Sequence, residues 1–378
     1  MRHFFQNYYM PQSKCHIAYF CPSTSWGGLE MNQLRNAKWM SDRGHKVLIF
    51  VQQSSSIHRE AIQLGLPVEL VKPHRKYYDF INAFRLIRKI KHHKITHLVV
   101  RDPRDMSVCA MAKSWAVNKF FLAYFMEMQI GIPKRDLLHT LRYESYDLWS
   151  CPLPWLENQV HELTKFPKER TVVIPSGLEL DKYLNAAQDK EAKLLLNLDP
   201  NKNYIGLVGR FDAQKGQLLL LRAFNKIKNS VGHDIVFLGE STHGEKDDYL
   251  IQLKMFVEQN QLEDRVSFRP FRNDVETFYS AIDVFVMATK SETFGMVTIE
   301  AMASGCRVVG SNRGGTVEIL NHGEFGTLFE SEDAADLAEK LLVAIQNNDF
   351  DPHKVIEESK KYDAHHVCKL VEATLGCK

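Results

Sequence analysis

A chain of 378 residues is too long for one ordinary hydrophobic core, and at roughly 100 to 200 residues per domain it is expected to form two domains. Its composition, 44% hydrophobic and 25% charged, is that of a globular protein, and no apolar run approaches the roughly 18 to 20 residues that cross a bilayer. The net charge of +2 conceals an asymmetry, because residues 1–177 carry 25 Lys and Arg against 14 Asp and Glu. A basic half suits an anionic acceptor or membrane surface, although a solvated surface or two complementary domain faces explain it equally well.

The seven cysteines are scattered, odd in number and form no CxxC pair, which predicts a reduced chain without a structural zinc. Residues 1–14 contain neither a continuous apolar stretch nor a small-residue cleavage site, so they do not resemble a signal peptide. We therefore expect a cytoplasmic protein, with peripheral contact with the inner face of the cytoplasmic membrane as an extension of that expectation.

Short apolar runs rich in β-branched and aromatic residues alternate with longer segments of helical period, which is typical of βα units and parallel sheets. The first set of predicted strands comprises residues 16–21, 46–51, 68–71, 96–100, 120–124, 147–150 and 171–174. The second set comprises residues 204–208, 234–238, 266–268, 283–287, 307–310 and 326–329.

Between the two sets lies a polar stretch, 175–200, which begins with a Ser176–Gly177 turn and where we place a hinge. The predicted fold class is α/β, with two Rossmann-like domains that face each other across a cleft. We expect an N-terminal domain over 1–178 that binds an acceptor, a C-terminal domain over 179–351 that binds a donor, and a helix over 352–378 that crosses back to the first domain.

The most informative stretch covers residues 283–315 and reads DVFVMATKSETFGMVTIEAMASGCRVVGSNRGG. It predicts a strand, a polar loop, a helix from Phe294 to Ser304 and a second buried strand, which together form a βαβ unit. Glu292 would lie in the loop and Glu300 two helical turns later, about 12 Å further along. That distance suits a nucleotide-sugar better than a single reacting atom.

The expected ligand contacts follow from the groups that a nucleotide-sugar presents. Its diphosphate is attracted to the free backbone amides at a helix start. Phe294, Gly295 and Met296 would supply these amides, and Thr293 precedes them in the donor-binding loop. Carboxylates accept hydrogen bonds from vicinal diols, so Glu292 is predicted to hold the transferred sugar and Glu300 the ribose. The alternative for Glu300 is an ordinary helix glutamate.

A second cluster, GRFDAQKG, covers Gly209 to Gly216 directly after a predicted strand. Arg210 and Lys215 are predicted to converge on the same diphosphate and to neutralise charge on the leaving group. Taken alone, such residues are more often solvated loop charges, but their position upstream of the Glu292–Glu300 unit favours ligand binding. The sequence lacks the Gly-Lys-Ser/Thr ending of a P-loop, which argues against an NTPase.

In the first half, Gly27 and Gly28 follow the first strand and open a helix, which allows the backbone to approach a phosphate or sugar. Glu127 follows the fifth strand, where it would orient a hydroxyl or form a structural salt bridge. Arg101 and Arg104 end the fourth strand and are candidate acceptor-binding residues, with mutual ion pairing in RDPRD as the competing interpretation.

The segment 80–94 reads as an amphipathic basic helix with Phe80, Phe84, Ile87 and Ile90 on one side. Packing of that side into the core is the favoured interpretation, and contact with an anionic membrane is the alternative. The pair His92–His93 has no third ligand nearby in the sequence and is not predicted to bind a metal.

At these residues the sequence resembles the retaining GT-B glycosyltransferases of family 4, also called glycosyl transferases group 1. The resemblance is strongest over 171–329, through IPSGLELDKY, GLVGRFDAQKG, the Glu-x7-Glu element from Glu292 to Glu300, and the glycine pair that follows. The N-terminal half matches more loosely, through the WGGLE loop and RGHKV.

The resemblance implies that Arg210 and Lys215 bind the donor diphosphate, Glu292 the transferred sugar and Glu300 the ribose. It places the loops at Gly239–Glu240 and Phe271–Arg272 near the nucleobase. Family members commonly carry a histidine after the fifth N-terminal strand, and Glu127 stands at about that position here, which is a departure from the family pattern.

The implied reaction is sugar transfer from a nucleotide-sugar, most simply a UDP-sugar, to a glycan or lipid-linked acceptor with retention at the anomeric carbon. Catalysis would rest on positioning and on support of the leaving diphosphate, without a cofactor or a bound metal. Bacterial surface polysaccharide or lipopolysaccharide synthesis is the expected setting, and no nucleic acid is expected as a partner. The alternatives are another sugar-nucleotide enzyme, such as an epimerase or phosphorylase, and a non-catalytic sugar-nucleotide-binding protein.

Overall fold

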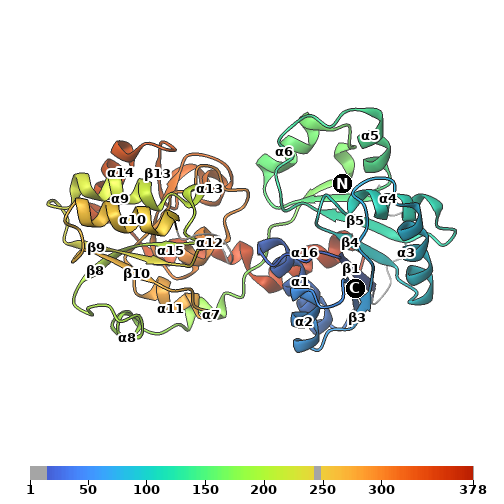
Figure 1. Cartoon of the computed structure of the whole chain (residues 1–378), viewed down its shortest axis with the longest axis horizontal. Coiled ribbons are helices and arrows are strands. Elements are labelled where there is room, and N and C mark those ends of the chain that lie inside the picture. The colour runs from blue at the N-terminus through green and yellow to red at the C-terminus, as the bar shows by residue number, and fades with distance from the viewer. Residues whose placement is uncertain (1–14, 242–247, 378) are drawn as a thin grey trace. The chain divides into compact units, whose positions relative to one another are not determined.

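The computed structural model describes residues 15–241 and 248–377, so the interpretation of residues 1–14 lies outside the described part of the chain. The chain divides into two compact units, with boundaries at Gly177/Leu178 and at Asp363/Ala364 (Figure 1). The first boundary falls within one residue of the predicted position. The second shows that the chain returns to the first unit for its last helix.

Both units are built on parallel sheets, and every predicted strand is present with bounds within one residue of the prediction. The first sheet contains β1 (His16–Cys21), β2 (Lys46–Val51), β3 (Val68–Leu70), β4 (His97–Val100), β5 (Phe121–Phe125), β6 (Leu148–Cys151) and β7 (Thr171–Val173). The second contains β8 (Asn203–Val208), β9 (His233–Leu238), β10 (Val266–Arg269), β11 (Val284–Met287), β12 (Arg307–Ser311) and β13 (Thr327–Phe329).

The two sheets share one topology, which sets where each can bind a ligand. The first has the order β3-β2-β1-β4-β5-β6-β7 and the second β10-β9-β8-β11-β12-β13. In each, the strand order reverses beside the first strand of the unit, between β1 and β4 and between β8 and β11. Open parallel sheets bind ligands in the crevice outside the carboxyl ends of the strands at such a switch point.

The strands read as continuous apolar runs because helices cover both faces of each sheet. Along β1 the side chains alternate between two cores: Ala18 and Phe20 pack into one cluster, and Ile17 and Tyr19 into the other. Figure 1 shows the helices in layers on either side of each sheet. The predicted α/β class with two Rossmann-like domains is confirmed.

The helices of the first unit are α1 (Gly28–Asp42), α2 (Ser56–Gln63), α3 (Phe80–His92), α4 (Met106–Trp115), α5 (Leu137–Glu144), α6 (Pro154–Leu163) and α16 (Ala364–Leu375). Those of the second are α7 (Asp181–Leu184), α8 (Asp189–Leu195), α9 (Gln217–Ile227), α10 (Asp248–Gln259), α11 (Val275–Ser280), α12 (Met296–Ala303), α13 (Gly315–Ile319), α14 (Ala334–Gln346) and α15 (Pro352–Ser359). Polar side chains cap the amino ends of several helices. At α3, Asp79 accepts a hydrogen bond from the Asn82 amide, and at α14, Asp333 accepts one from the Ala335 amide.

The single C-terminal helix predicted over 352–378 is two helices in two units. α15 packs against α12 in the second unit, and α16 packs against α1 in the first. The chain changes unit between them, after Tyr362 and Asp363, where Leu178 donates a backbone hydrogen bond to the Tyr362 carbonyl at 2.8 Å. The prediction was therefore wrong for α15, because its helical composition does not reveal which sheet its apolar side faces.

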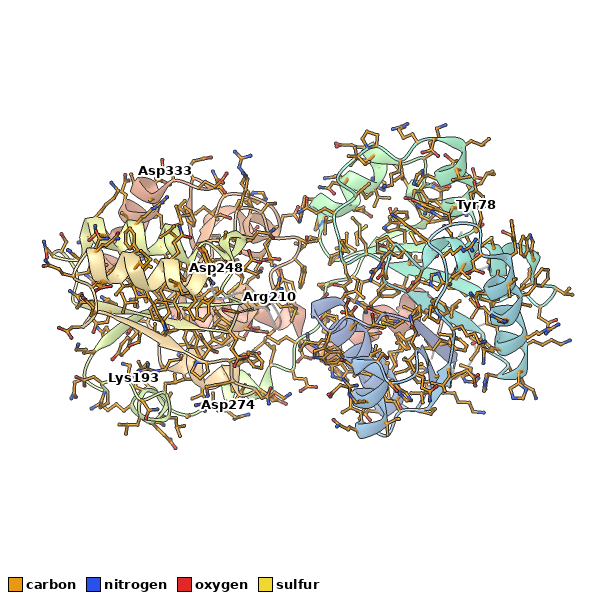
Figure 2. All side chains as sticks on the ribbon, in the orientation of Figure 1. Tyr78, Lys193, Arg210, Asp248, Asp274 and Asp333 are labelled. Atoms are coloured by element: carbon orange, nitrogen blue, oxygen red, sulfur yellow. A yellow bond between two sulfur atoms is a disulfide. The ribbon has the colours of Figure 1, made fainter. Side chains whose placement is uncertain are left out.

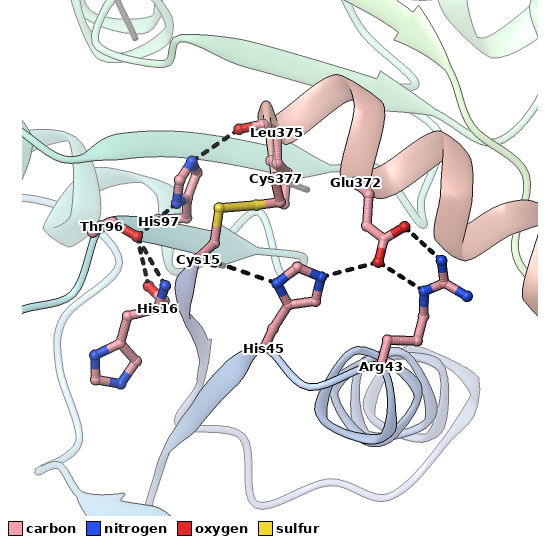
Figure 3. The surroundings of a disulfide bond; sticks show 9 residues. All are labelled: Cys15, His16, Arg43, His45, Thr96, His97, Glu372, Leu375 and Cys377. Carbon is pink, nitrogen blue, oxygen red and sulfur yellow. Dashed lines mark hydrogen bonds and ion pairs between the residues drawn. A yellow bond between two sulfur atoms is a disulfide. The ribbon is translucent and has the colours of Figure 1, made fainter. Parts of the chain in front are cut away.

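The expectation of a fully reduced chain was also wrong. Cys15, just before β1, is joined to Cys377, just after α16, by a disulfide across 362 positions of sequence (Figure 3). Both cysteines are buried, and the remaining five are free and buried. Scattered spacing did not predict this pair because the return of α16 to the first sheet is a tertiary event.

The amphipathic interpretation of α3 needs a correction as well. Its buried residues are Ala83, Leu86 and Ile90, whereas Phe80 and Phe84 are more than half exposed. The helix is thus rotated relative to the predicted apolar side. Among the described residues, no helix combines the length and apolar character that crossing a membrane requires.

Candidate functional site

The switch point of the second sheet brings together the two loops that the sequence singled out. Lys215 follows β8 and Glu292 follows β11, and the Nζ atom of Lys215 lies 3.4 Å from Oε2 of Glu292. Both side chains are partly exposed, at 31% and 22%. The two loops therefore meet at this switch point, and the lysine contacts the carboxylate that the sequence predicts to bind the sugar.

Two glycines allow the loops at this switch point to lie backbone to backbone. A Cβ atom on Gly216, which has a φ of 74°, would lie 2.3 Å from the Ala288 carbonyl oxygen. A Cβ atom on Gly314, at a φ of 66°, would lie 2.3 Å from the Glu292 carbonyl oxygen. The next amide, that of Gly315, donates to the same Glu292 oxygen at 2.8 Å. Glycine is required at both positions by close approach and by positive φ.

Arg210 lies at the carboxyl end of β8 with a side chain that is 61% exposed (Figure 2). Its backbone carbonyl accepts a hydrogen bond from Gln217 at 2.7 Å, which ties the loop to the start of α9. The guanidinium lies 4.0 Å from Asp212, whose carboxylate accepts a hydrogen bond from the Gln214 amide at 2.8 Å. The Arg210 guanidinium thus lies at the switch point of the second sheet and is exposed there.

The helix after Glu292 begins later than predicted. α12 starts at Met296, and Gly295 precedes it with a φ of 103°. Phe294 is buried against Tyr362, with ring centroids 5.9 Å apart, so its side chain is part of the packing. Thr293 lies in the loop, next to Glu292. The first amides of a helix have no intrahelical acceptor, so the start of α12 faces the loop with hydrogen-bond donors.

Glu300 is held by a buried tyrosine. The hydroxyl of Tyr279 donates to Oε2 of Glu300 at 2.8 Å, and Tyr279 is 1% exposed. Burial raises the pKa of Tyr279, and the charge of Glu300 adds to the rise, so Tyr279 stays a donor at every physiological pH. The hydrogen bond from Tyr279 orients the Glu300 carboxylate at the side of α12.

The loops after β9 and β10 complete the edge of this sheet. A Cβ atom on Gly239 would lie 2.0 Å from the Gly209 carbonyl oxygen, and Glu240 accepts a backbone hydrogen bond from Phe211 at 3.0 Å. Phe271 is 56% exposed, whereas Arg272 is paired with Asp274 at 2.6 Å. Gly239 and Glu240 therefore adjoin the switch point, and the Arg272 guanidinium is bound locally.

The first unit has its own polar group at the ends of β4 and β5. Arg101 forms an ion pair with Glu127, and Asn32 of α1 donates to the other Glu127 oxygen at 3.3 Å. Both charged side chains are less than 10% exposed. Burial raises the pKa of Glu127, although the positive charge of Arg101 opposes that rise. Both residues line a small cavity beside Asn32. The ion pair itself is the structural salt bridge that was the alternative for Glu127.

The other half of the RDPRD segment is a local ion pair. Arg104 binds Asp102 through two nitrogen atoms, with the shorter contact at 2.5 Å, as the competing interpretation of this segment stated. Gly27 is the residue before α1, and Gly28 is its first residue. These residues lie at the carboxyl edge of the first sheet, at or next to its switch point.

Sequence reasoning missed a buried acid and base beside this edge. Nε2 of His74 lies 2.9 Å from Oδ1 of Asp105, and its Nδ1 lies 3.0 Å from the Arg75 carbonyl. Burial raises the pKa of Asp105 to about 6. Although burial opposes it, the hydrogen bonds to Asp105 and Arg75 raise the pKa of His74. No sequence motif marks this pair, because His74 lies in the segment between β3 and α3.

Within the described residues, one group of side chains has metal-ligand geometry: Cys15, His97 and Cys377. Two of its three members are joined in the disulfide, and His97 lies 3.0 Å from the Leu375 carbonyl (Figure 3). We therefore do not assign a metal to it. The charged side chains around the switch point of the second unit include Arg210, Lys215, Glu292 and Glu300.

A doubly wound sheet with two basic side chains and a helix start at its switch point is an arrangement in which α/β proteins commonly bind phosphorylated ligands. Comparison with protein families gives the particular class. Residues 189–362 match the family described as glycosyl transferases group 1, and residues 26–182 match glycosyltransferase family 4. The chain belongs to this glycosyltransferase family.

Individual relatives agree with that membership. The chain is 30% identical to a D-inositol 3-phosphate glycosyltransferase of Paenarthrobacter aurescens over 178 residues, 46% of this chain and 42% of that protein. It is 26% identical to an N-acetyl-alpha-D-glucosaminyl L-malate synthase of Bacillus anthracis over 87% of each chain. The inositol phosphate relatives are therefore matched over about two fifths of their length.

Solved structures share the whole fold. A glycosyltransferase of Rickettsia africae superimposes with a TM-score of 0.84 over 96% of this chain and 98% of its own, at 18% identity. HepE of Anabaena, determined in complex with UDP, superimposes with a TM-score of 0.82 over 95% of this chain and 99% of its own, at 21% identity. At these identities the comparison establishes the GT-B fold.

Proposed function

We propose that the protein transfers a sugar from a nucleotide-sugar to a hydroxyl of a glycan or lipid-linked acceptor, with retention of the anomeric configuration. The observation that carries the proposal is the pairing of Lys215 with Glu292 at the switch point of the second sheet. A cation and a carboxylate in contact, beside the amino end of α12, match the two halves of such a donor: an anionic diphosphate and a sugar rich in hydroxyl groups.

In this proposal the diphosphate lies against the start of α12, with Arg210 and Lys215 as its counter-charges. Lys215 exchanges its contact with Glu292 for a phosphate oxygen, which frees that carboxylate for the hydroxyls of the sugar. Glu300, oriented by Tyr279, accepts hydrogen bonds from the ribose. Gly239 and Glu240 lie at the nucleobase end with the exposed ring of Phe271, and the local pairing of Arg272 makes it a lesser contributor.

The chemical step depends on charge at the leaving group. As the bond from the anomeric carbon to the diphosphate breaks, negative charge grows on the departing oxygen, and two fixed cations stabilise it. The departing phosphate takes the proton of the acceptor hydroxyl on the same face of the sugar, which gives retention. Neither a cofactor nor a metal ion is required by this scheme.

A UDP-sugar is our proposed donor. HepE, which shares the fold, was determined with UDP and with UDP-glucose. On the acceptor side, the relatives named for D-inositol 3-phosphate and L-malate act on small anionic molecules by their names. An anionic acceptor fits the basic first half, where the Arg104 side chain stays 59% exposed beside Asp102. Arg101 and Glu127 form a buried ion pair, which has to open before either residue contacts the acceptor. We place the reaction in bacterial surface polysaccharide or lipopolysaccharide synthesis, in the cytoplasm beside its membrane.

Ligand-induced stabilisation tests the donor. UDP-, GDP- and ADP-sugars are screened for a rise in melting temperature, and UDP-sugars are expected to give the largest rise. Glu292→Gln should keep nucleotide binding and lose transfer by orders of magnitude. Conversion of the donor without any acceptor would indicate an epimerase or phosphorylase, and binding without turnover under any acceptor would indicate a non-catalytic protein.

A further inference from the structure

The outer face of α3 is apolar at its start and basic along the rest. Phe80, Ile81 and Phe84 are 52%, 66% and 57% exposed, although aromatic and aliphatic side chains of this size usually pack inward. Arg85, Arg88 and Lys91 are exposed on the same side of the helix, opposite the buried residues. α3 contains no acidic residue. One exposed face therefore combines large apolar groups with positive charge.

The apolar part continues onto two neighbouring helices. Trp115 at the end of α4 stacks on Phe80 and Phe84, with ring centroids 5.6 and 5.2 Å apart, and is itself 41% exposed. A groove of about 300 Å³ runs from these rings to α5. We call the exposed apolar residues of this region the α3–α5 surface: Tyr78, Phe80, Ile81, Phe84, Trp115, Leu138 and Leu141. Tyr78 is labelled in Figure 2, and α3, α4 and α5 lie on the same side of the first sheet in Figure 1.

The charges beside this surface are available to an anionic partner. Lys89 is turned inward and paired with Glu69. Arg85, Arg88 and Lys91 form no ion pair with any carboxylate in the described part of the chain, and Arg85 only contacts Asn82, at 3.1 Å. Exposed cations without local counter-charges, next to exposed aromatic rings, are complementary to a partner that is both anionic and apolar.

We propose that the α3–α5 surface docks this protein on an anionic phospholipid bilayer. The rings of Phe80, Phe84 and Trp115 enter the boundary between head groups and acyl chains, where aromatic side chains are favoured. Arg85, Arg88 and Lys91 remain at the level of the lipid phosphates, where each cation near a charged surface adds to the attraction. A neutral apolar partner would leave those three cations unpaired, and a soluble acidic partner would not bury the rings.

The surface adjoins the region in which we place the acceptor. Ser107, at the start of α4 and two residues after Asp105, lines the groove and accepts a hydrogen bond from Arg142 at 3.3 Å. A bilayer bound here would present an amphiphilic acceptor next to the loop that carries Arg101 and Arg104. This link to the acceptor rests on the proposed function, whereas bilayer binding itself does not.

Sedimentation with vesicles tests the docking. The full chain is mixed with phosphatidylcholine vesicles that contain either no or about 30% phosphatidylglycerol, at low and high salt. We expect binding to the anionic vesicles only, and weaker binding at high salt. The F80Q/F84Q pair and the R85Q/R88Q/K91Q triple should each lower the partition coefficient about tenfold or more.

Matched variants separate this surface from general effects. I251Q/M255Q on α10 removes two apolar side chains of similar exposure, 52% and 51%, and K165Q/K168Q/K190Q removes the same charge from other exposed positions. Both controls should bind vesicles as the parent does. Donor binding, followed by thermal stabilisation with UDP, should be unchanged in F80Q/F84Q and shows that this variant is folded.

Three results overturn the proposal. They are equal binding of the parent to neutral and anionic vesicles, unchanged vesicle binding by F80Q/F84Q, and a dimer of the parent in solution that dissociates in F80Q/F84Q. The last would make the face an interface between copies of this chain. Absence of UDP stabilisation in the parent protein would instead count against the proposed function, and the sedimentation result would still decide vesicle binding.

Discussion

The ammonium group of Lys215 lies 3.4 Å from Oε2 of Glu292, so the cation proposed for the diphosphate contacts the carboxylate proposed for the sugar. Each neutralises the other, which avoids two uncompensated charges at one switch point. Under the proposed function, donor binding separates them, and each gains a partner on the ligand.

Lys215→Ala should weaken UDP binding by about 10- to 100-fold, because a hydrogen bond between charged groups contributes about 1.5–3 kcal/mol. Calorimetric titration with UDP measures this. Lys290→Ala is the control, since Lys290 is exposed in the adjacent loop and is paired with Glu332 at 2.7 Å. Equal UDP affinity in Lys215→Ala and the parent would falsify the diphosphate role.

Tyr279→Phe should weaken UDP binding by a few-fold, consistent with about 1 kcal/mol for a neutral donor, because Glu300 loses the hydroxyl that orients it. Glu300→Gln should have a larger effect. Both effects should disappear when the ligand is 2′,3′-dideoxy-UDP, which lacks the hydroxyls that Glu300 accepts from. A penalty that persists with the dideoxy compound would show that these residues act on stability and not on the ribose.

Gly314→Ala should displace the Glu292 loop, because the added Cβ would meet the Glu292 carbonyl and the positive φ disfavours any side chain. We expect a loss of about 1–3 kcal/mol in the free energy of unfolding, together with a much larger loss of transfer than of UDP affinity. Gly232→Ala, which meets no atom within 4 Å, serves as the control. Full transfer activity in Gly314→Ala would argue against the placement of Glu292.

Removal of the Cys15–Cys377 disulfide should lower the free energy of unfolding by about 2–5 kcal/mol, because the bond closes a very long loop. Denaturant titrations of the parent with and without reductant, and of C15A/C377A, measure it. The parent in reductant and the variant should agree. A parent that is insensitive to reductant would mean that the two thiols are not joined in solution.

Stability should fall as the pH drops from about 6.5 towards 4, in part through His97. Burial lowers the pKa of His97 to about 4, against a smaller opposing contribution from the Leu375 carbonyl. As the pH falls, His97 is therefore protonated in the unfolded chain before it is protonated in the folded chain. Near pH 5 this difference lowers the free energy of unfolding by about 2 kcal/mol. Urea midpoints near pH 7.5 and pH 5 measure it, and His97→Gln should show a flatter dependence. An identical slope in the variant would assign the effect to other histidines.

Most of the fold could be predicted from local patterns. Every strand was found within one residue because both faces of each sheet are covered, so strands read as unbroken apolar runs between polar loops. The helix starts were less accurate: α12 begins at Met296, since Gly295 takes a positive φ and Phe294 packs against Tyr362, which is distant in sequence.

The pairings within the candidate site could not be predicted from the sequence. Lys215 and Glu292 were placed in separate loops by motif and strand position, and their contact depends on β8 and β11 being neighbours. The partner of Glu300, the pairing of Arg101 with Glu127, and the His74–Asp105 pair each join segments between 21 and 31 residues apart. No periodicity in the chain encodes such pairs.

The sequence by itself determined the alternation of strands and helices, the two-unit organisation and the loops that carry the charged residues, because these follow from hydrophobic period and from where parallel strands end. Tertiary structure alone decided that Cys15 meets Cys377, that α15 and α16 belong to different units, and that Phe80 and Phe84 face outward. Each of those depends on which side of a helix finds a partner across the chain, and that choice is made by packing between distant segments.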